Sequence, residues 1–202
     1  MKLPEYEITG TAVRLNQMEP PVYKGRAHLI SSLLEAHKRA AICNFNSIST
    51  ATLLNAYAGS GSVIQSIAAA LLTTGNAHAP LTGTREALNY FLKTGAALPS
   101  VVNGKERYLG LGNSFYKDKI DPSFQDAYLE FLLYLQFYEK SNLLERYATQ
   151  VSEITGKMLF PNAAGITAAI CLELNDEDFA EVSYFIQGRV RGWTYLLSHY
   201  KL

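Results

Sequence analysis

Apolar side chains recur at helical spacing through most of this chain, and this periodicity decides what it can fold into. The clearest case is the segment 121–138, where Asp121 can cap a helix and Pro122 suits its first turn. The same pattern predicts helices over residues 27–42, 51–57, 62–74, 85–93, 142–155, 166–174 and 179–199. Apart from a short strand or extended arm within residues 5–13, we find no convincing strand pair. The predicted fold class is all-α.

One histidine stands at the end of an Ala-rich segment. Residues 62–74 are predicted to form a buried helix, whose small side chains would let another helix approach closely. Gly75 stops this helix, and Pro80 prevents the backbone from resuming it at once. His78 lies between them, where its ring can face a cleft. A satisfied structural histidine is the alternative interpretation.

The amino-acid composition indicates which kinds of partner the protein has and in which compartment it works. Lys plus Arg and Asp plus Glu each number 18, so there is no basic excess of the kind that nucleic-acid binders carry. Cys43 and Cys171 lie far apart, which favours a reducing compartment over a disulfide framework. The four histidines are scattered, so no metal site is predicted. With no apolar signal segment and no run long enough for a membrane span, a soluble cytoplasmic protein without nucleic-acid or membrane partners is expected.

Two other reactive side chains, His37 and Cys43, are predicted to have structural roles, and two glycines are predicted to shape a loop. His37 is predicted to lie on the solvated face of its helix, because Lys38 and Arg39 follow it. Cys43 is expected to be a small buried thiol, although a nearby base would make it a candidate nucleophile. Gly110 and Gly112 stand in a loop, where they would let the backbone pass close to a ligand.

Several short motifs, taken in order, resemble the citrate synthase superfamily, including its citryl-CoA lyase branch. The resemblance covers roughly residues 40–199. The matching segments are Asn46-Ser47-Ile48-Ser49-Thr50 for NxST, Gly75-Asn76-Ala77-His78 for GxxHGGA, Gly110-Leu111-Gly112-Asn113-Ser114-Phe115-Tyr116-Lys117 with Asp121-Pro122 for GxGHxxYKxxDPR, Asn162-Ala163-Ala164-Gly165 for NxDG, and Arg189-Val190-Arg191-Gly192-Trp193 for RxxGW. Each motif is short, but their order and separations fit the family.

The resemblance implies a citrate synthase-like helical fold with a truncated large domain and a small lobe, in a homodimer or higher homo-oligomer. Residues 1–83 would be large-domain helices with an N-terminal arm, 84–160 the small lobe, and 161–202 the return to the large domain, all in one compact unit. The ligands implied are a small carboxylic acid and a coenzyme A thioester, with no covalently bound cofactor. The site residues implied are His78 and Asn113 for catalysis, Arg189, Asn46 and Asn162 for substrate, and Gly110, Gly112 and Lys117 for coenzyme A.

Departures from the family motifs are concentrated at the groups that move protons. The family's catalytic carboxylate is Ala164 here, and its second histidine is Asn113. A methyl group cannot act as a base, and an amide cannot act as a general acid at neutral pH. Ser123 and Cys43 likewise replace an arginine and a histidine of the motifs.

These departures leave two main hypotheses. The first is a divergent citrate synthase-like protein that lacks the standard activity and keeps the fold for binding, assembly or regulation. The alternative is an acyl-CoA or thioester-dependent carbon–carbon lyase or synthase of altered chemistry, which would use His78 and recruit Asp118 or Glu106 as a base. A third hypothesis concerns assembly, through residues 63–70 and 166–174 at a symmetric interface.

Overall fold

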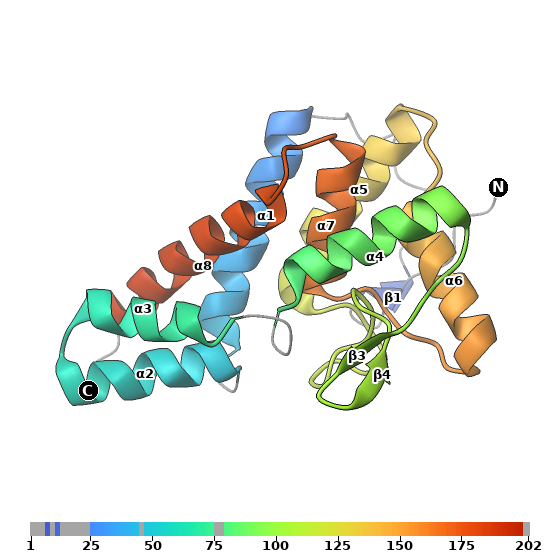
Figure 1. Ribbon diagram of the computed structural model, residues 1–202. Helices are drawn as coiled ribbons and strands as arrows, with labels where there is room; N and C mark the ends of the chain where they lie inside the picture. Colours follow the sequence, from blue (N-terminus) through green and yellow to red (C-terminus); the bar gives the residue numbers. More distant parts are fainter. Residues whose placement is uncertain (1–6, 9–10, 13–24, 45–46, 75–78, 200–202) are drawn as a thin grey trace.

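The computed structural model describes residues 7–8, 11–12, 25–44, 47–74 and 79–199, and it is a helical fold (Figure 1). The all-α class is therefore confirmed. The helices are α1 Arg26–Cys43, α2 Ile48–Ser60, α3 Val63–Leu72, α4 Leu81–Thr94, α5 Gln125–Phe137, α6 Leu143–Thr155, α7 Ala163–Glu173 and α8 Ala180–His199, with a 3-10 turn, η2 Pro122–Phe124, before α5. The strands are β1 Glu7–Ile8, β2 Thr11–Ala12, β3 Ser100–Val102 and β4 Lys105–Arg107, and they form two antiparallel pairs.

Short polar side chains cap helices α2, α3, α6 and α7 and the turn η2. In each case a side-chain oxygen accepts a hydrogen bond from an otherwise unpaired backbone N–H of the first turn. Asp121 caps the Pro122–Phe124 turn as predicted, and Asn142 caps α6. Glycines in the left-handed conformation end α2, α4 and α6.

The pair β3–β4 corrects the prediction that the chain has no convincing strand pair. Its turn is Asn103-Gly104, and both residues have positive φ angles, 51° and 72°. This conformation matches the right-handed twist of the two strands, which is why Asn-Gly is a strong hairpin signal. The flanking strands are only three residues long, which is too short for alternating polar and apolar residues to mark them in the sequence.

Three helix starts also differ from the prediction, and one of them is α4, which begins at Leu81 rather than Arg85. Helix α2 begins at Ile48 rather than near Ala51, because Ser47 caps it by accepting a hydrogen bond from the Thr50 N–H. Helix α7 begins at Ala163 rather than Ile166, because Asn162 caps it through the Gly165 N–H. Small residues near these starts add little to the apolar periodicity, so the periodicity does not mark where the helices begin.

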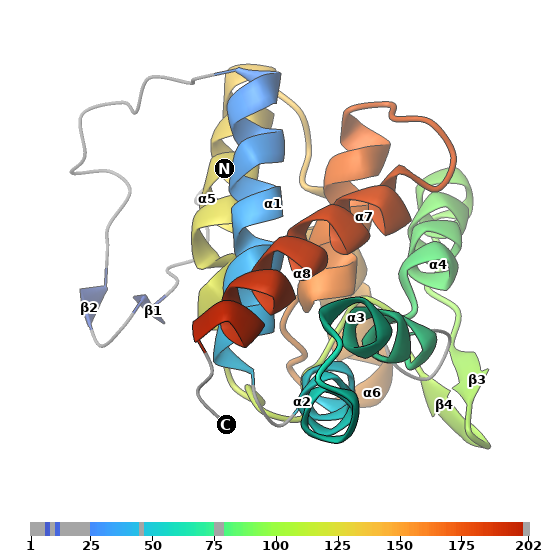
Figure 2. The same ribbon diagram turned by 90° about the vertical axis from the view of Figure 1, so that its left-hand side faces the viewer.

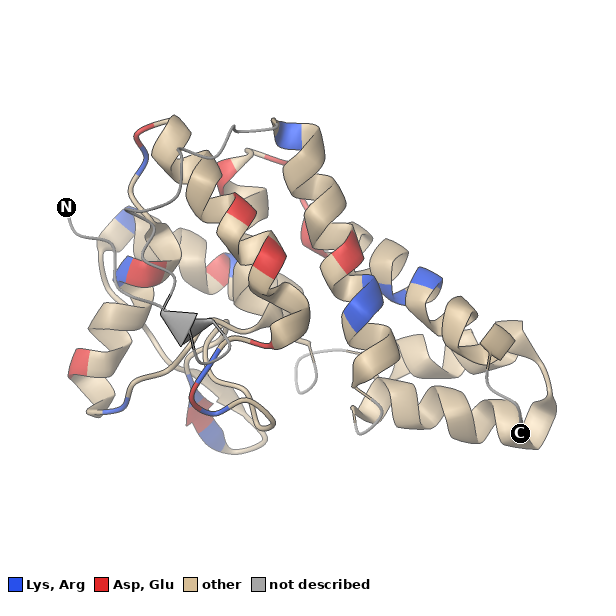
Figure 3. Cartoon of the chain, turned by 180° about the vertical axis from the view of Figure 1, so that it is seen from behind, with Lys and Arg blue, Asp and Glu red and all other residues tan. Residues whose placement is uncertain are grey.

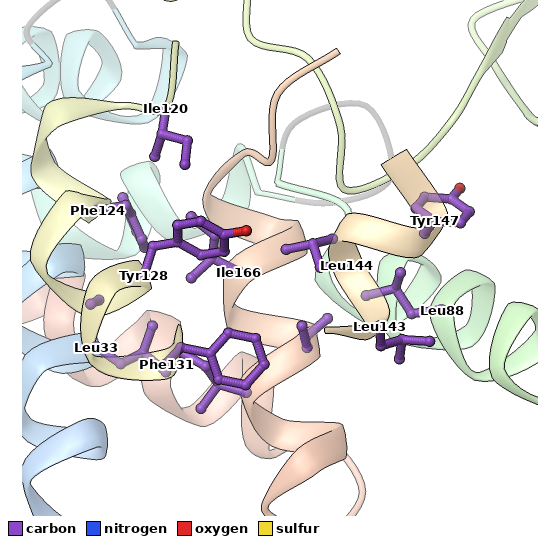
Figure 4. Close-up of a cluster of buried hydrophobic side chains, with 14 of the residues drawn as sticks. Leu33, Leu88, Ile120, Phe124, Tyr128, Phe131, Leu143, Leu144, Tyr147 and Ile166 are labelled. Atoms are coloured by element: carbon purple, nitrogen blue, oxygen red, sulfur yellow. The ribbon is translucent and has the colours of Figure 1, made fainter. Parts of the chain in front are cut away.

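The main core contains side chains from each of the predicted ranges 1–83, 84–160 and 161–202 (Figure 4). Leu33 of α1, Leu88 of α4 and Ile166 of α7 are each fully buried in this cluster. Aromatic side chains of α5 and the turn before it, including Phe124 and Phe131, fill the space between α1 and α7. Residues 84–160 therefore share one hydrophobic core with helices α1 and α7.

Helix α8 crosses directly over α1 at two glycines (Figure 2). A Cβ added at Gly188 would lie 2.4 Å from the His37 Cβ, and one added at Gly192 would lie 2.4 Å from the Lys38 carbonyl oxygen. Both distances are well below van der Waals contact, so only glycine allows the helix backbones to come this close. The spacing of four residues places both glycines on the same face of α8.

A second, smaller core lies where the α2–α3 hairpin packs against the C-terminal half of α8. Trp193 is fully buried there, and its indole N–H donates to the Thr50 hydroxyl at 3.3 Å. The prediction that the Ala-rich segment is buried is wrong in part. Only Ser66 and Ala70 of α3 are buried, and Ile64 on its outer face is 81% exposed.

The close crossing of α1 and α8 predicts a specific stability effect. We expect Gly188→Ala to lower the free energy of unfolding by about 1–3 kcal/mol, because the added methyl group forces the two helices apart. Gly59→Ala in α2 is the control, since nothing lies within 4 Å of its added Cβ. That change should leave stability unchanged or raise it by up to about 1 kcal/mol. Urea unfolding of the three proteins measures the difference, and equal stability of the Gly188 and Gly59 variants would contradict the packing argument.

Candidate functional site

Arg189 is a buried cation that makes no ion pair with a carboxylate of the described residues. It lies on α8, is 8% exposed, and places its guanidinium 5.3 Å from the centroid of the Phe185 ring. Its Nε and Nη1 atoms have no hydrogen-bond partner, and no carboxylate of the described residues lies within ion-pair distance. Burial lowers the pKa of Arg189 to about 10, against a smaller opposing effect of Asp121. Arg189 therefore has free donors that a bound anion could satisfy.

His37 lies next to Arg189, which corrects the prediction that it occupies a solvated face. Its side chain is fully buried and packs edge-on against Phe124 and Phe185, with ring centroids 4.9 and 5.4 Å away. Its Nε2 lies 2.9 Å from the Thr167 hydroxyl. Lys38 and Arg39 made this part of α1 look exposed, but α8 covers His37 because Gly188 permits the close crossing.

The electrostatic consequence is that His37 is neutral. Burial, followed by the positive charge of Arg189, holds the pKa of His37 well below its usual value of 6.5. A protonated ring would place a second positive charge in this desolvated region beside the guanidinium.

The glycine-rich loop 108–113 is bound to the start of α7 by backbone contacts. Gly110 has a φ of 86°, and a Cβ on Gly165 would lie only 2.2 Å from the Gly110 carbonyl oxygen. Asn162 donates from its amide nitrogen to the Gly112 carbonyl at 2.9 Å, while its amide oxygen caps α7. The Asn162 side chain thus links the loop, through its amide nitrogen, to α7, through its amide oxygen. Its substrate-binding role stays a prediction, as do the coenzyme A roles of Gly110 and Gly112.

Ala164 sits beside this loop in an apolar environment. It belongs to a buried cluster with Leu81 and Phe185, against which Ala79 and Val182 also pack. Phe185 contacts His37 and Arg189, so the start of α7 and the Arg189 region form one continuous neighbourhood. His78 and Asn46 lie outside the described residues, so their predicted roles stay predictions.

A chain of hydrogen bonds borders the same region. The Tyr116 hydroxyl donates to the Asn44 amide oxygen at 3.3 Å, and the Asn44 amide nitrogen donates to Asp121 at 3.2 Å. Asp121 also accepts from the Ser123 N–H at 2.9 Å. Burial raises the pKa of Tyr116, with smaller contributions from the charges of Asp121 and Cys43. Tyr116 is therefore a neutral hydrogen-bonding group here. No motif assigned this role to Asn44, and only its position near the end of a helix could have drawn attention to it.

The remaining predicted residues are partly or fully exposed. The Asn113 amide oxygen accepts a hydrogen bond from the Phe115 N–H at 2.8 Å, which leaves its amide nitrogen to donate elsewhere. Lys117, Asp118 and Glu106 are exposed. Cys43 is exposed as well, so the expectation of a buried thiol is wrong for this residue, whereas Cys171 is buried.

Within the described chain, no group of three or more His, Cys, Asp or Glu side chains is placed to hold a metal ion. None of the helices in that part is long and apolar enough to cross a membrane.

The helical packing of this chain is that of a citrate synthase/citryl-CoA lyase-like fold. One solved structure that it resembles is citryl-CoA lyase from Hydrogenobacter thermophilus. That match has a TM-score of 0.59 and 27% sequence identity, and it covers 84% of this chain and 68% of the lyase chain. No protein-family model and no curated protein matches the sequence. The chain is thus a divergent form of this fold.

The lowered pKa of His37 predicts a pH-dependent stability. Below pH 6.5 the unfolded chain binds a proton at this histidine that the folded chain does not bind. The contribution of His37 to unfolding free energy should therefore be constant above pH 6.5 and fall by up to about 1.4 kcal/mol per pH unit below it. Urea unfolding from pH 5 to 7.5 should show a steeper loss for the wild type than for His37→Phe. Substitution of the exposed His199 by Phe provides the control. If the free energy of unfolding falls in parallel in the wild type and in His37→Phe, His37 is not neutral in the fold.

Proposed function

We propose that this protein binds a small carboxylic acid at Arg189 and lacks the standard citrate-forming and citryl-CoA-cleaving chemistry. The observation that carries the proposal is the buried guanidinium with two unpaired N–H groups. Burying a charge without a partner costs several kcal/mol, and a partner of opposite charge offsets that cost. A carboxylate is the natural complement, because its two oxygens match the fork of donors that a guanidinium presents.

The absence of a standard base supports the second half of the proposal. Ala164 stands at the motif position of the catalytic carboxylate, and its surroundings are the apolar side chains Leu81 and Phe185. This is a poor place for an ionised group, because nothing there would replace its hydration. Asn113 can stabilise an oxyanion by donating a hydrogen bond, but it cannot supply a proton. Binding of a carboxylate therefore agrees better with Ala164 and Asn113 at these positions than a reaction that needs proton transfer does.

A matched pair of arginines tests the binding site. Arg189→Gln should weaken the binding of a small carboxylate, with citrate and propionate as probes, by about tenfold or more, since a charge-assisted pair is lost. Arg191→Gln removes an exposed arginine from the same helix and should leave affinity unchanged. Calorimetric titration at low ionic strength provides the comparison. Equal affinities in the two variants, or failure of the wild type to bind any carboxylate, would refute the proposal.

The alternative function is thioester chemistry on an acyl-CoA. The likeness to a citryl-CoA lyase favours it, and the free amide nitrogen of Asn113 could act with His78 to stabilise an enolate oxygen. The base would have to come from outside the family pattern. Turnover of citryl-CoA by the purified protein, abolished by His78→Ala, would support this alternative and exclude the binding-only function.

We also propose that the protein forms a homodimer through the α2–α3 hairpin, in the reducing cytoplasm that its cysteine usage predicts. No Asp, Glu, Lys or Arg occurs from residue 40 to residue 84, and Figure 3 shows this hairpin without charged residues. Ile64 and Leu72 of α3 are 81% and 85% exposed. An uncharged apolar surface of this kind fits an identical surface across a two-fold axis. Helix α7, the other predicted interface segment, is instead buried in the core from Ala164 to Cys171.

The dimer proposal predicts a position-specific effect on assembly. Ile64→Asp would place a charge on the uncharged face and should shift the protein toward the monomer in sedimentation velocity. Ile154→Asp is the control, because Ile154 is an exposed isoleucine, 55% accessible, on α6. That variant should keep the wild-type mass. A wild type that sediments as a monomer at all concentrations would remove the proposal.

A further inference from the structure

Helix α4 lies beside the segment that leads into β3 (Figure 1), and a groove runs between them. One wall of the groove is formed by Gly83, Glu86, Ala87 and Tyr90, and the other by residues 98–100. The spacing of three, four and seven residues places these four residues on one face of α4. The groove has a volume of about 330 Å³, which is at the lower end of the range for small-molecule sites. Its size therefore suits a small ligand.

The groove carries a negative charge that has no ion pair within the described chain. Glu86 is exposed, and none of the described Lys, Arg or His side chains forms an ion pair with it. The adjacent Arg85 is engaged elsewhere, because its guanidinium donates to the Glu181 carboxylate at 2.8 Å and to backbone carbonyls between α7 and α8. A ligand in the groove consequently meets the Glu86 carboxylate without displacing an internal cation.

An aromatic ring lies one helical turn from this carboxylate. Tyr90 is 44% exposed and follows Glu86 by four residues, so the two side chains are neighbours on the surface of α4. Among the described residues, no cationic group and no second ring lies against the Tyr90 ring. The face of an aromatic ring attracts a cation, and organic ammonium ions are characteristic ligands of such faces. The carboxylate and the ring thus both favour a positively charged ligand.

The remaining walls favour a ligand with a hydrocarbon part. Ala87, Leu98 and Pro99 line the groove, and Leu98 is 53% exposed. Methylene groups of a ligand would cover these apolar side chains and remove them from water, which is favourable. A metal ion would gain nothing from them, because it needs several oxygen or nitrogen ligands around it.

We propose that this groove binds a small aliphatic amine in its ammonium form. In this arrangement the ammonium group lies between the Glu86 carboxylate and the Tyr90 ring, and the hydrocarbon chain lies along Ala87 and residues 98–100. The groove needs a ligand of the opposite charge to the one that Arg189 would bind, and none of its lining residues belongs to the cluster around Arg189. The proposal is therefore independent of carboxylate binding at Arg189.

Three probes of similar size test the charge requirement. The first is n-butylammonium, n-butanol replaces its charge by a neutral hydroxyl group, and butyrate reverses the charge. Titration of the nitrogen-labelled full chain by NMR at neutral pH follows the backbone amides of Glu86, Tyr90 and Ser100. At these amides we expect millimolar binding of n-butylammonium, about fivefold weaker binding of n-butanol, and no shift with butyrate. Salt at about 0.5 M should weaken the binding of n-butylammonium and not that of n-butanol.

Two variants and a matched control separate the carboxylate from the ring. Glu86→Gln keeps the length of the side chain and removes its charge, so the affinity for n-butylammonium should fall toward that for n-butanol. Tyr90→Leu keeps an apolar side chain without an aromatic face, so it should weaken n-butylammonium about two- to fivefold and leave n-butanol unchanged. Glu153→Gln is the control, because it removes an exposed carboxylate of α6 that does not line the groove.

The outcomes decide this proposal separately from the one for Arg189. Equal affinities of n-butylammonium and n-butanol would overturn it, and so would an n-butylammonium affinity that Glu86→Gln leaves at the wild-type value. Amides of the groove that n-butylammonium does not shift at high millimolar concentration would overturn it as well. Arg189→Gln should bind n-butylammonium as the wild type does, so a failure of the carboxylate site would leave this result unchanged.

Discussion

The contact between α1 and α8 at Gly188 and Gly192 is the constraint on which the candidate site depends. Because no side chain separates the two helices there, α8 lies on the backbone of α1 and seals His37 beneath it. The next residue, Arg189, then extends over Phe185 into the region beside His37. A wider separation would admit water around both polar side chains, and their unpaired atoms would then hydrogen-bond to solvent. Close helix packing thus sets the chemistry of the site.

A second glycine contact ties this region to the start of α7. Gly110 and Gly165 touch through their backbones, and the Asn162 amide donates to the Gly112 carbonyl of the loop while it caps α7. This arrangement belongs to a citrate synthase/citryl-CoA lyase-like fold. By the motif resemblance, Ala164 and Asn113 would stand where the family has its proton-transfer groups. The proposed binding function follows these residues, because a fold alone does not determine function.

Local sequence signals predicted much of the helical framework, because caps and apolar periodicity act over a few residues. Asp121, Asn142 and Gly156 mark helix ends where the structure has them. Burial of His37 could not be predicted in this way, since it depends on α8, which lies about 150 residues further along the chain. The exposure of α3 has a similar cause: an apolar helix looks the same in sequence whether it faces its own core or another protein. The motif predicts Arg189 as a site residue, but only the structure shows that no carboxylate of the described residues forms an ion pair with it.

The most direct test of the proposed carboxylate site is nitrogen NMR of the Arg189 side chain in the folded protein, with and without citrate. We predict that the Arg189 Nε resonance shifts when citrate is added, because a carboxylate pairs with N–H groups that have no partner in the protein alone. The exposed Arg191 on the same helix should not shift. An Arg189 resonance that saturating citrate leaves unchanged would contradict the proposal.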